Sequence, residues 1–397
     1  MKVAILGYGT VGSGVYEVLT KNAQLIEKRA GERIEVKYVL DLREFPGDPV
    51  ENVLVHDYSI IASDPEIGVV VEVMGGTEPA YTFVKEALLK GKSVCTSNKE
   101  LVAKYGAELI EIAKQKKINF LFEASVGGGI PVIRPLISSI TCDEVEEVSG
   151  ILNGTTNYIL TKMSSENLDF EDVLKDAQAK GFAERNPSAD IDGFDAARKL
   201  AILASLSYGK QVDFEDIYTE GITDIDKRDM LYAKALGMKI KLVASAKKTD
   251  GGISAMVTPK LVDEANPLYN VDDVFNAVLV HGNFLGDVMF YGKGAGKLPT
   301  ASAVASDVVD AVKHNGKHVI IYWNPKKLEL EKKACVYSKF FVRVPKADRD
   351  MAAKLFRIEK AAEAEIEDEF AFITAPMSEG DFDAKASEIK VIGRIRA

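Results

Sequence analysis

The stretch that decides the fold opens the chain: Lys2-Val3-Ala4-Ile5-Leu6-Gly7-Tyr8-Gly9-Thr10-Val11-Gly12. Its apolar first half is typical of a buried strand, and the helix-spaced apolar residues from Val11 to Ile26 predict an amphipathic helix. Between a strand and a helix, Gly7 permits a tight turn, Gly9 lets the backbone approach a pyrophosphate, and Gly12 allows close packing of helix on strand. An ordinary strand–helix turn is the alternative. We predict a dinucleotide site whose residues are Gly7, Gly9, Thr10, Val11 and Gly12.

Strand and helix patterns alternate through the first third of the chain. Short apolar runs at 34–40, 69–74, 93–95 and 118–122 are separated by stretches with helical periodicity, including 80–89 and 104–114. Strands this apolar, separated by helices, indicate a parallel sheet covered on both faces. We therefore predict an α/β fold with a doubly wound, Rossmann-type sheet over residues 1–135, completed by a returning helix at about 298–318.

The pattern changes after Pro131 and Pro135. Strand-like runs at 145–152, 240–246 and 274–280 and helical stretches at 158–163, 170–180 and 193–207 predict a second, α+β domain over 136–297. The lysine- and glutamate-rich segment 324–333 is typical of a linker. Beyond it, strand-like stretches at 339–344, 370–374 and 389–395 and helical stretches at 347–356 and 381–388 predict a small α+β module over 335–397.

Composition excludes several classes of protein. Hydrophobic residues make up 47% and charged residues 28% of the 397 residues, which is typical of a globular chain. The formal net charge of -10 argues against nucleic acid or an anionic membrane as a partner. No run reaches about 18 apolar residues, so we expect neither a membrane span nor a signal peptide. Three cysteines (Cys95, Cys142 and Cys335) in no metal-ligand spacing suggest reduced thiols and a soluble, cytoplasmic protein.

The end of the second predicted strand bears on the choice of cofactor. An acidic residue there usually binds the ribose 2′-hydroxyl of NAD, whereas an arginine accepts the 2′-phosphate of NADP. The sequence offers both, as Asp41 and Arg43. The preference between NAD and NADP stays open, and Asp41 as a plain turn residue is a further alternative.

Two more loops follow predicted strands, at the sheet edge where open α/β sheets bind ligands. Lys99 lies in the first, placed to reach a substrate or a nicotinamide, although a solvated surface lysine is the alternative. The second runs from Glu123 to Pro131 and contains three consecutive glycines. Such a loop suits an anion nest or an oxygen-ligated cation, or is a flexible connector.

The most informative charged residues lie at a predicted helix after residue 193. Asp195 and Lys199 stand at i and i+4, on one helix face. A surface ion pair is the alternative, but the rest of this helix is apolar almost all round, which indicates burial. Glu184 and Asp190 add carboxylates nearby. Clusters of this kind often bind an ammonium group or tune the pKa of a lysine.

With these residues in place, the sequence resembles homoserine dehydrogenase. The matching pieces occur in the family's order from Met1 to about Lys313, and together they are far more specific than any one of them. They are the loop 7–15, Ser97-Asn98-Lys99, the loop 123–131, Asn153-Gly154-Thr155-Thr156-Asn157-Tyr158-Ile159-Leu160, and the segment 190–199.

The resemblance implies reversible, NAD- or NADP-dependent oxidation of L-homoserine to L-aspartate 4-semialdehyde, in the branch leading to threonine, methionine and isoleucine. Hydride transfer needs a proton for the developing alkoxide, which a lysine ammonium can supply. The implied roles are as follows: Lys199 and Lys99 as acid/base lysines, Asp195 orienting the substrate, Glu184, Asp190, Gly154 and Thr155 binding the amino acid, Gly181 and Gly296 lining the nicotinamide, and Glu123, Val126, Gly128 and Ile130 holding Na⁺ or K⁺.

The resemblance also implies a homodimer or higher homo-oligomer, formed through the second domain's sheet. The tail resembles an ACT-like regulatory module, but it is short, and Val344-Pro345-Lys346 stands where such modules usually have a Pro-Gly pair. A tail that serves only in assembly is therefore the alternative to one that mediates threonine feedback. Two other functions are alternatives. A phosphorylating semialdehyde dehydrogenase needs an activated cysteine, and the acidic setting of Cys142 would raise its pKa. A non-catalytic amino-acid sensor would not need Lys99, Lys199 and Asp195.

Overall fold

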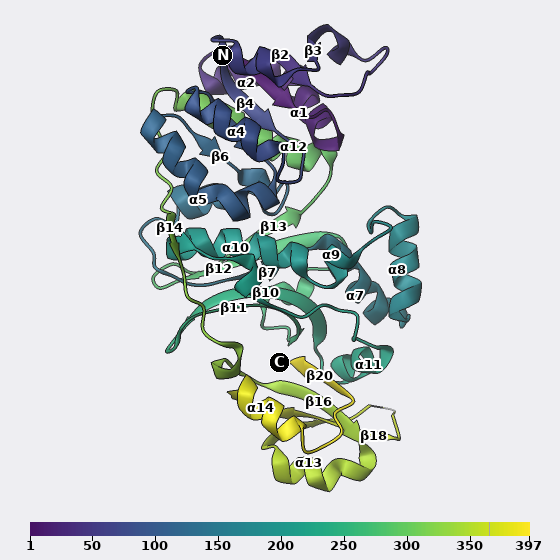
Figure 1. Cartoon of the computed structure of the whole chain (residues 1–397). Helices are drawn as coiled ribbons and strands as arrows, with labels where there is room; N and C mark the ends of the chain where they lie inside the picture. The colour runs from purple at the N-terminus through teal and green to yellow at the C-terminus, as the bar shows by residue number, and fades with distance from the viewer. Residues whose placement is uncertain (365) are drawn as a thin grey trace. The chain divides into compact units, whose positions relative to one another are not determined.

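The computed structural model describes residues 1–364 and 366–397, and they divide into two compact units. Unit 1 consists of Met1–Asp143, Ala201–Asp213 and Gly292–Leu328, and unit 2 of Glu144–Leu200, Phe214–Tyr291 and Glu329–Ala397. Each unit is therefore assembled from three separated segments of the chain (Figure 1).

Unit 1 is built on a parallel sheet of six strands in the order β3-β2-β1-β4-β5-β6. This is the strand order of a doubly wound dinucleotide-binding fold, so the predicted fold class is confirmed. The strands are β1 Lys2–Leu6, β2 Glu35–Leu40, β3 Leu54–Val55, β4 Ile67–Glu72, β5 Ser93–Thr96 and β6 Phe120–Leu121. The helices are α1 Thr10–Lys21, α2 Ala23–Ala30, α3 Tyr58–Ser63, α4 Ala80–Leu89, α5 Lys99–Lys116, α6 Ile133–Ser138 and α12 Lys297–Lys313.

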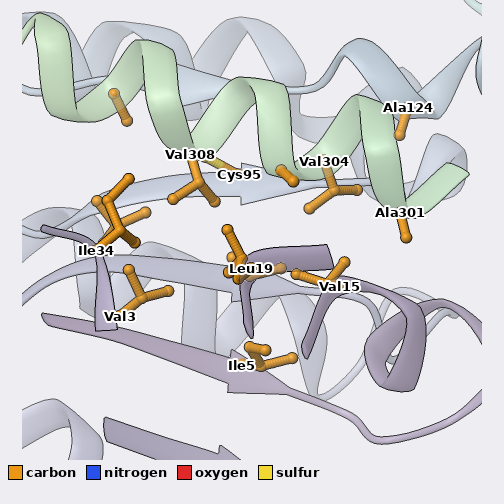
Figure 2. Close-up of a cluster of buried hydrophobic side chains, with 14 of the residues drawn as sticks. Val3, Ile5, Val15, Leu19, Ile34, Cys95, Ala124, Ala301, Val304 and Val308 are labelled. Atoms are coloured by element: carbon orange, nitrogen blue, oxygen red, sulfur yellow. The ribbon is translucent and has the colours of Figure 1, made fainter. Parts of the chain in front are cut away.

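Side-chain alternation along the strands explains why helices cover both faces of this sheet. Val3 and Ile5 of β1 point to the face where α1 and α12 pack together, and Figure 2 shows Val304 and Val308 of α12 directed into the same cluster. The intervening residues of β1 are also fully buried, and α4 and α5 pack on each other and on β4 to β6. Residues from late in the chain thus complete the core of the N-terminal sheet.

Unit 2 contains one large mixed sheet, in which the strands follow the order β13-β12-β7-β10-β11-β20-β16-β18-β17, and β9 also pairs with β11. Its strands before the tail are β7 Val145–Ile151, β9 Tyr218–Thr219, β10 Lys239–Thr249, β11 Gly252–Val262, β12 Phe275–Gly282 and β13 Gly286–Lys293. Its helices are α7 Gly154–Glu166, α8 Phe170–Ala179, α9 Ser188–Ile191, α10 Phe194–Tyr208, which runs on into the segment counted with unit 1, and α11 Lys227–Ala235.

The tail continues this sheet. Its elements are β15 Tyr337–Ser338, β16 Phe340–Pro345, α13 Arg349–Leu355, β17 Ile358–Ala362, β18 Glu369–Thr374, β19 Met377–Ser378, α14 Glu379–Ala386 and β20 Gly393–Arg396. The main strands and helices follow the β-α-β-β-α-β order of ferredoxin-like modules. The last strand, β20, lies antiparallel to β16 and parallel to β11, where Arg396 is in register with Lys260 (Figure 1). The pattern of the sequence did not indicate this continuity.

Helix α11 and its N-cap residue contact strand β16 of the tail. The rings of Tyr232 and Phe341 are 5.7 Å apart, and Arg343, which is 1% exposed, makes ion pairs with Asp226 at 2.8 Å and Asp229 at 2.9 Å. Desolvation raises the pKa of Asp229 to about 6, against the opposing effect of Arg343. The tail is therefore joined to its unit by both backbone pairing and buried charge.

Two expectations about local structure need correction. The expected linker 324–333 contains a strand, β14 Asn324–Lys327, because its backbone pairs with β8 Lys210–Gln211. The last strand occupies Gly393–Arg396 rather than 389–395, since residues from Ser387 onward first close the end of α14. Across the described ranges, 1–364 and 366–397, no helix is long and apolar enough to cross a membrane.

Candidate active site

The glycine loop leaves β1 at the carboxyl edge of the unit 1 sheet. Gly7 has φ +98°, a conformation that L side chains rarely adopt, and its N–H donates to the Leu40 carbonyl at 2.8 Å. A Cβ on Gly12 would overlap the Gly7 carbonyl oxygen, whereas a Cβ on Gly9 would meet no atom within 4 Å. Gly12 is therefore needed for packing, and Gly9 borders open space that a dinucleotide phosphate can occupy. A cavity of about 600 Å³ begins at Gly7 and Gly9.

Asp41 and Arg43 line the same cavity, and they contact each other. The Asp41 carboxylate accepts the Tyr8 N–H at 2.8 Å and two guanidinium hydrogen bonds from Arg43, each at 3.0 Å. These bonds, with the Arg43 pair the largest cause, hold the pKa of Asp41 well below its usual range. Asp41 thus ties the glycine loop to the end of β2, and the Arg43 side chain, 62% exposed, remains open to solvent.

Lys99 is the first residue of α5, directly after β5. Asn98 caps this helix, because its side chain accepts the Leu101 N–H at 3.1 Å and donates to the Gly76 carbonyl at 2.6 Å. Next to it, the buried Glu72 at the end of β4 accepts the Thr96 hydroxyl at 2.6 Å, and burial raises the pKa of Glu72. Sequence reasoning missed Glu72, because a single carboxylate ending an apolar run gives no periodic signal.

The loop proposed to bind an alkali-metal ion is fixed at both ends. The buried Glu123 carboxylate accepts the N–H groups of Val132, Ile133 and Arg134 at 2.6 to 2.8 Å, so it caps α6. Its own N–H donates to the Asp307 carboxylate of α12 at 2.8 Å. Asp307 also accepts from the Arg134 guanidinium at 2.6 Å, while burial, with the charge of Glu123 adding, raises its pKa to about 8.

Two backbone segments, 128–129 and 293–294, meet in that loop without side chains between them. A Cβ on Gly128 would overlap the carbonyl group of Gly294, and Gly129 donates its N–H to the Lys293 carbonyl at 3.3 Å. Val126 and Ile130, on either side of the glycines, are buried. Gly296, which precedes α12, has φ +124° and belongs to the same unit. Within the two described ranges, no group of three or more His, Cys, Asp or Glu residues could hold a metal ion.

In unit 2, Asp195 and Lys199 form a nearly buried ion pair. The Lys199 ammonium donates to Asp195 at 2.7 Å and to the Leu152 carbonyl at 2.7 Å, and the two side chains are 12% and 6% exposed. Asn153 donates to the same Asp195 oxygen at 2.9 Å and to Asp190 at 2.7 Å. Burial, followed by the charge of Asp195, raises the pKa of Asp190.

Asn153 joins the two carboxylates, and sequence reasoning did not assign it a role. It also caps α7, because its side-chain oxygen accepts the Thr156 N–H at 2.9 Å. Gly154 and Thr155 form the first turn of that helix, and the Thr155 hydroxyl donates to the Phe182 carbonyl at 2.7 Å, next to Gly181. Glu184 follows and is exposed. Apart from the exposed Glu184, the residues expected to bind the amino acid therefore converge on the start of α7.

The predicted site residues fall into two groups. Unit 1 holds the glycine loop, Asp41, Arg43, Lys99, Gly296 and the 123–130 loop, and unit 2 holds Gly154, Thr155, Gly181, Glu184, Asp190, Asp195 and Lys199. A dinucleotide-binding sheet in the same chain as a buried lysine–carboxylate cluster defines a nicotinamide-dependent oxidoreductase.

Comparison with known proteins gives the family. The family model described as homoserine dehydrogenase, NAD binding domain, matches residues 7–123, and the one described as homoserine dehydrogenase matches residues 131–309. A homoserine dehydrogenase of Synechocystis sp. is 47% identical over 323 residues, which is 79% of this chain and 73% of that protein. The chain belongs to the homoserine dehydrogenase family, and it is an oxidoreductase that acts on a CH–OH group, as predicted.

Comparison with solved structures supports the same family. The crystal structure of a homoserine dehydrogenase from Thiobacillus denitrificans superposes with a TM-score of 0.92 at 36% identity, covering 100% of this chain and 97% of that one. A hyperthermophilic archaeal homoserine dehydrogenase in complex with NADPH has a TM-score of 0.67 at 30% identity, covering 78% of this chain and 97% of that one. The nicotinamide cofactor predicted from the glycine loop is thus supported by the family and by the fold.

Proposed function

We propose that this chain interconverts L-homoserine and L-aspartate 4-semialdehyde, and that Lys199 is the principal proton donor and acceptor. The observation that carries this assignment is the Lys199 ammonium, held by the Asp195 carboxylate and the Leu152 carbonyl at 2.7 Å each. These two acceptors engage two of the three N–H groups of the ammonium, so the third N–H points in one direction. It can therefore donate to one substrate oxygen.

The proton balance of the reaction fits this arrangement. In the reducing direction the aldehyde carbon gains a hydride, which the nicotinamide supplies when bound, and its oxygen becomes an alkoxide. Lys199 Nζ donates a proton to that oxygen, so the products are the alcohol and a neutral amine that regains its proton from water. In the oxidising direction Lys199 accepts the hydroxyl proton. Lys99, at the start of α5, is the second lysine that we assign to acid/base work.

The carboxylates select the amino-acid substrate. Homoserine carries an α-ammonium group, and carboxylates are its strongest hydrogen-bond partners. Asp190 and Glu184 are assigned to that group, and Asp195 orients the substrate together with Lys199. Gly154 and Thr155, at the N-terminus of α7, offer backbone N–H groups that suit the α-carboxylate.

A coupled pair of measurements tests the proposed function. Purified protein should reduce NAD or NADP in the presence of L-homoserine at alkaline pH, and oxidise the reduced cofactor in the presence of the semialdehyde at neutral pH. Activity with L-threonine or L-serine as the only substrate, and none with homoserine, would overturn the assignment. A folded protein without activity on homoserine with either cofactor would do the same.

We propose that the cofactor site accepts both NAD and NADP. Asp41 is engaged by Tyr8 and Arg43, and the exposed Arg43 guanidinium is available to a 2′-phosphate. Replacing Arg43 with alanine should raise KM for NADP about tenfold, because it removes one charge-assisted phosphate contact, and change KM for NAD less than about twofold. Steady-state kinetics with each cofactor decide it, and equal effects on both would contradict the assignment.

The 123–130 loop is proposed to bind Na⁺ or K⁺. Three N–H groups already engage the Glu123 carboxylate, so the ligands would be mainly backbone carbonyls of Val126, Gly128 and Ile130. Backbone carbonyl oxygens suit hard cations. Thermal melting in KCl, NaCl and choline chloride at one ionic strength tests this without turnover, since a bound ion stabilises the fold.

The assembly, the location and the role of the tail are also proposals. We infer a cytoplasmic homodimer or larger homo-oligomer, and an ACT-like tail that binds a regulatory amino acid. The β-α-β-β-α-β order supports an ACT-like module. Light scattering measures the oligomeric state, and titration with threonine at fixed homoserine measures regulation. A monomer, or turnover that threonine does not alter, would remove the corresponding proposal.

A further inference from the structure

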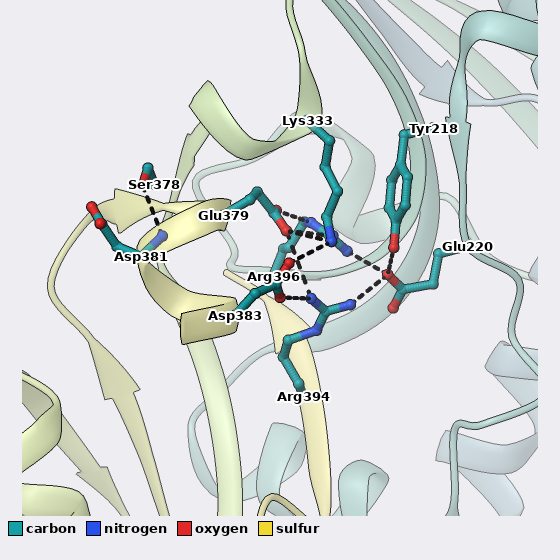
Figure 3. Close-up of polar contacts among 9 residues, drawn as sticks. All are labelled: Tyr218, Glu220, Lys333, Ser378, Glu379, Asp381, Asp383, Arg394 and Arg396. Atoms are coloured by element: carbon teal, nitrogen blue, oxygen red, sulfur yellow. Dashed lines mark hydrogen bonds and ion pairs between the residues drawn. The ribbon is translucent and has the colours of Figure 1, made fainter. Parts of the chain in front are cut away.

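The last strand of the chain carries charged residues that the proposed reaction does not use (Figure 3). Arg396 on β20 donates to Glu379 at 2.5 and 2.9 Å and to Glu220 at 2.8 Å. Arg394 donates to the same Glu220 oxygen at 2.8 Å. Glu220 directly follows β9 and is thus bound by two arginines that come more than 170 residues later in the chain.

The position of Glu220 is fixed by its backbone as well as by these arginines. Its N–H donates to the Val257 carbonyl of β11 at 2.8 Å, and its carboxylate accepts the Tyr218 hydroxyl at 3.2 Å. The Arg396–Glu379 pair behind it is 1% and 0% exposed, so it forms a rigid base, whereas Glu220 is 24% exposed. A buried pair with this bidentate geometry holds its partners in one arrangement.

The backbone next to Glu220 packs directly on the turn between the two substrate carboxylates. A Cβ on Gly221 would overlap the Ile191 carbonyl and lie 2.7 Å from Asp192 Cα. The Ile222 N–H donates to the Ile191 carbonyl at 2.8 Å. On the other side of the turn, a Cβ on Gly193 would lie 2.9 Å from the Thr219 methyl carbon. The segment 219–222 therefore touches the turn 191–193 with no intervening space.

We propose that Glu220, held by Arg394 and Arg396, positions the turn that carries Asp190 and Asp195, so that the end of the chain sets the affinity for the amino-acid substrate. This inference rests on the proposed function, in which those carboxylates bind and orient homoserine. Close-packed backbone transmits a displacement instead of absorbing it. Glu220, Arg394 and Arg396 are positioning residues, since they contact the turn or its support.

The test compares three variants with a matched control. Glu220→Ala and Glu220→Gln weaken the attachment at Glu220, and Arg394→Ala removes one of its two arginines; all three keep the buried Arg396–Glu379 pair. Asp383→Asn is the control, because Asp383 contacts Lys333 and Arg394 in the same cluster but not Glu220. For each variant, KM for homoserine, KM for the cofactor, kcat and the melting temperature are measured.

We expect Glu220→Ala to raise KM for homoserine about tenfold, with kcat and the cofactor KM changed less than about twofold, because a small displacement weakens a charge-assisted hydrogen bond to the substrate. Glu220→Gln and Arg394→Ala should give smaller increases, and Asp383→Asn none. A merely structural role would lower the melting temperature without this selective rise in KM. If Glu220→Ala fails to fold, the other two variants decide.

Two outcomes would overturn the inference: an unchanged KM for homoserine in Glu220→Gln and Arg394→Ala, or an equal rise in Asp383→Asn. These are distinct from failure of the proposed function, which would appear as wild-type protein that does not oxidise homoserine at all.

Discussion

Replacing Lys199 with alanine tests the proposed chemistry most directly. The change removes the ammonium that lies 2.7 Å from both Asp195 and the Leu152 carbonyl. Loss of a positioned general acid or base costs about 10²- to 10⁴-fold in kcat. Because Lys199 is also the charge nearest to the reacting oxygen in the proposed mechanism, we expect the upper part of this range, which corresponds to about 4 to 5 kcal/mol of transition-state stabilisation.

The same change also costs stability, and the structure bounds that cost. Removing one partner of a buried ion pair costs about 3 to 5 kcal/mol. Asp195 keeps the Asn153 hydrogen bond at 2.9 Å and Lys199 is 12% exposed, so we expect about 3 kcal/mol, at the lower end of that range. The variant should therefore fold but melt at a lower temperature.

The assay follows cofactor absorbance at saturating homoserine, with thermal melting on the same samples. Lys162→Ala is the matched control: Lys162 also pairs with a carboxylate four residues away, Glu166 at 2.6 Å, but on an exposed part of α7. Such a pair is worth about 0.3 to 0.5 kcal/mol, so kcat and melting should barely change. A folded Lys199→Ala variant whose kcat stays within about tenfold of wild type would refute the assignment of Lys199 as principal acid.

Two further predictions concern pH and the glycine loop. Burial, followed by the charge of Asp195, raises the pKa of Asp190, so this carboxyl gains a proton at a higher pH than an ordinary aspartate does. The Asp190 carboxylate attracts the substrate ammonium above that pKa, and this attraction is lost as the pH falls through it. KM for homoserine should therefore rise on acidification in wild type, whereas in Asp190→Asn it should be high and nearly independent of pH. The same pH profile of KM in both proteins would contradict the assignment of Asp190 to the substrate ammonium. Gly12→Ala forces a Cβ onto the Gly7 carbonyl, so it should cost about 1 to 3 kcal/mol of stability and weaken cofactor binding. Gly9→Ala meets no atom, so melting of the free protein should be unchanged while cofactor affinity, measured by fluorescence titration, falls; normal affinity in Gly9→Ala would show that the phosphates lie elsewhere.

The features that could be predicted from the sequence are those with a local pattern. The apolar strand, the glycine spacing and the following helix lie within residues 2–21, and the observed β1 and α1 occupy that stretch. The i, i+4 spacing of Asp195 and Lys199 on an apolar helix likewise indicated a buried pair, which the structure contains. In each case the residues of the pattern lie within one short, continuous stretch of the chain.

Residues outside such patterns were missed. Asn153 lies in the family-like segment 153–160, but the sequence around it predicts no role, although its side chain joins Asp190 and Asp195 across 37 and 42 residues. Asp307, which holds the 123–130 loop, comes 184 residues after Glu123. A hydrogen bond between residues this far apart leaves no periodicity in the sequence. The available signal was chemical: a polar residue inside an apolar helix, or just before one, needs a partner when it is buried.

The sequence by itself determined the parallel dinucleotide-binding sheet, the family and the identity of the charged residues that we assign to the reaction. These follow from short-range spacing, because φ/ψ freedom, side-chain alternation and helical period act over a few residues. Only the tertiary structure decided which carboxylates share a donor and that β20 extends the sheet of unit 2. Only the tertiary structure shows that Arg394 and Arg396 bind Glu220. Those contacts depend on how distant strands are brought together, which is set by packing and burial over the whole unit and not by any local run of residues.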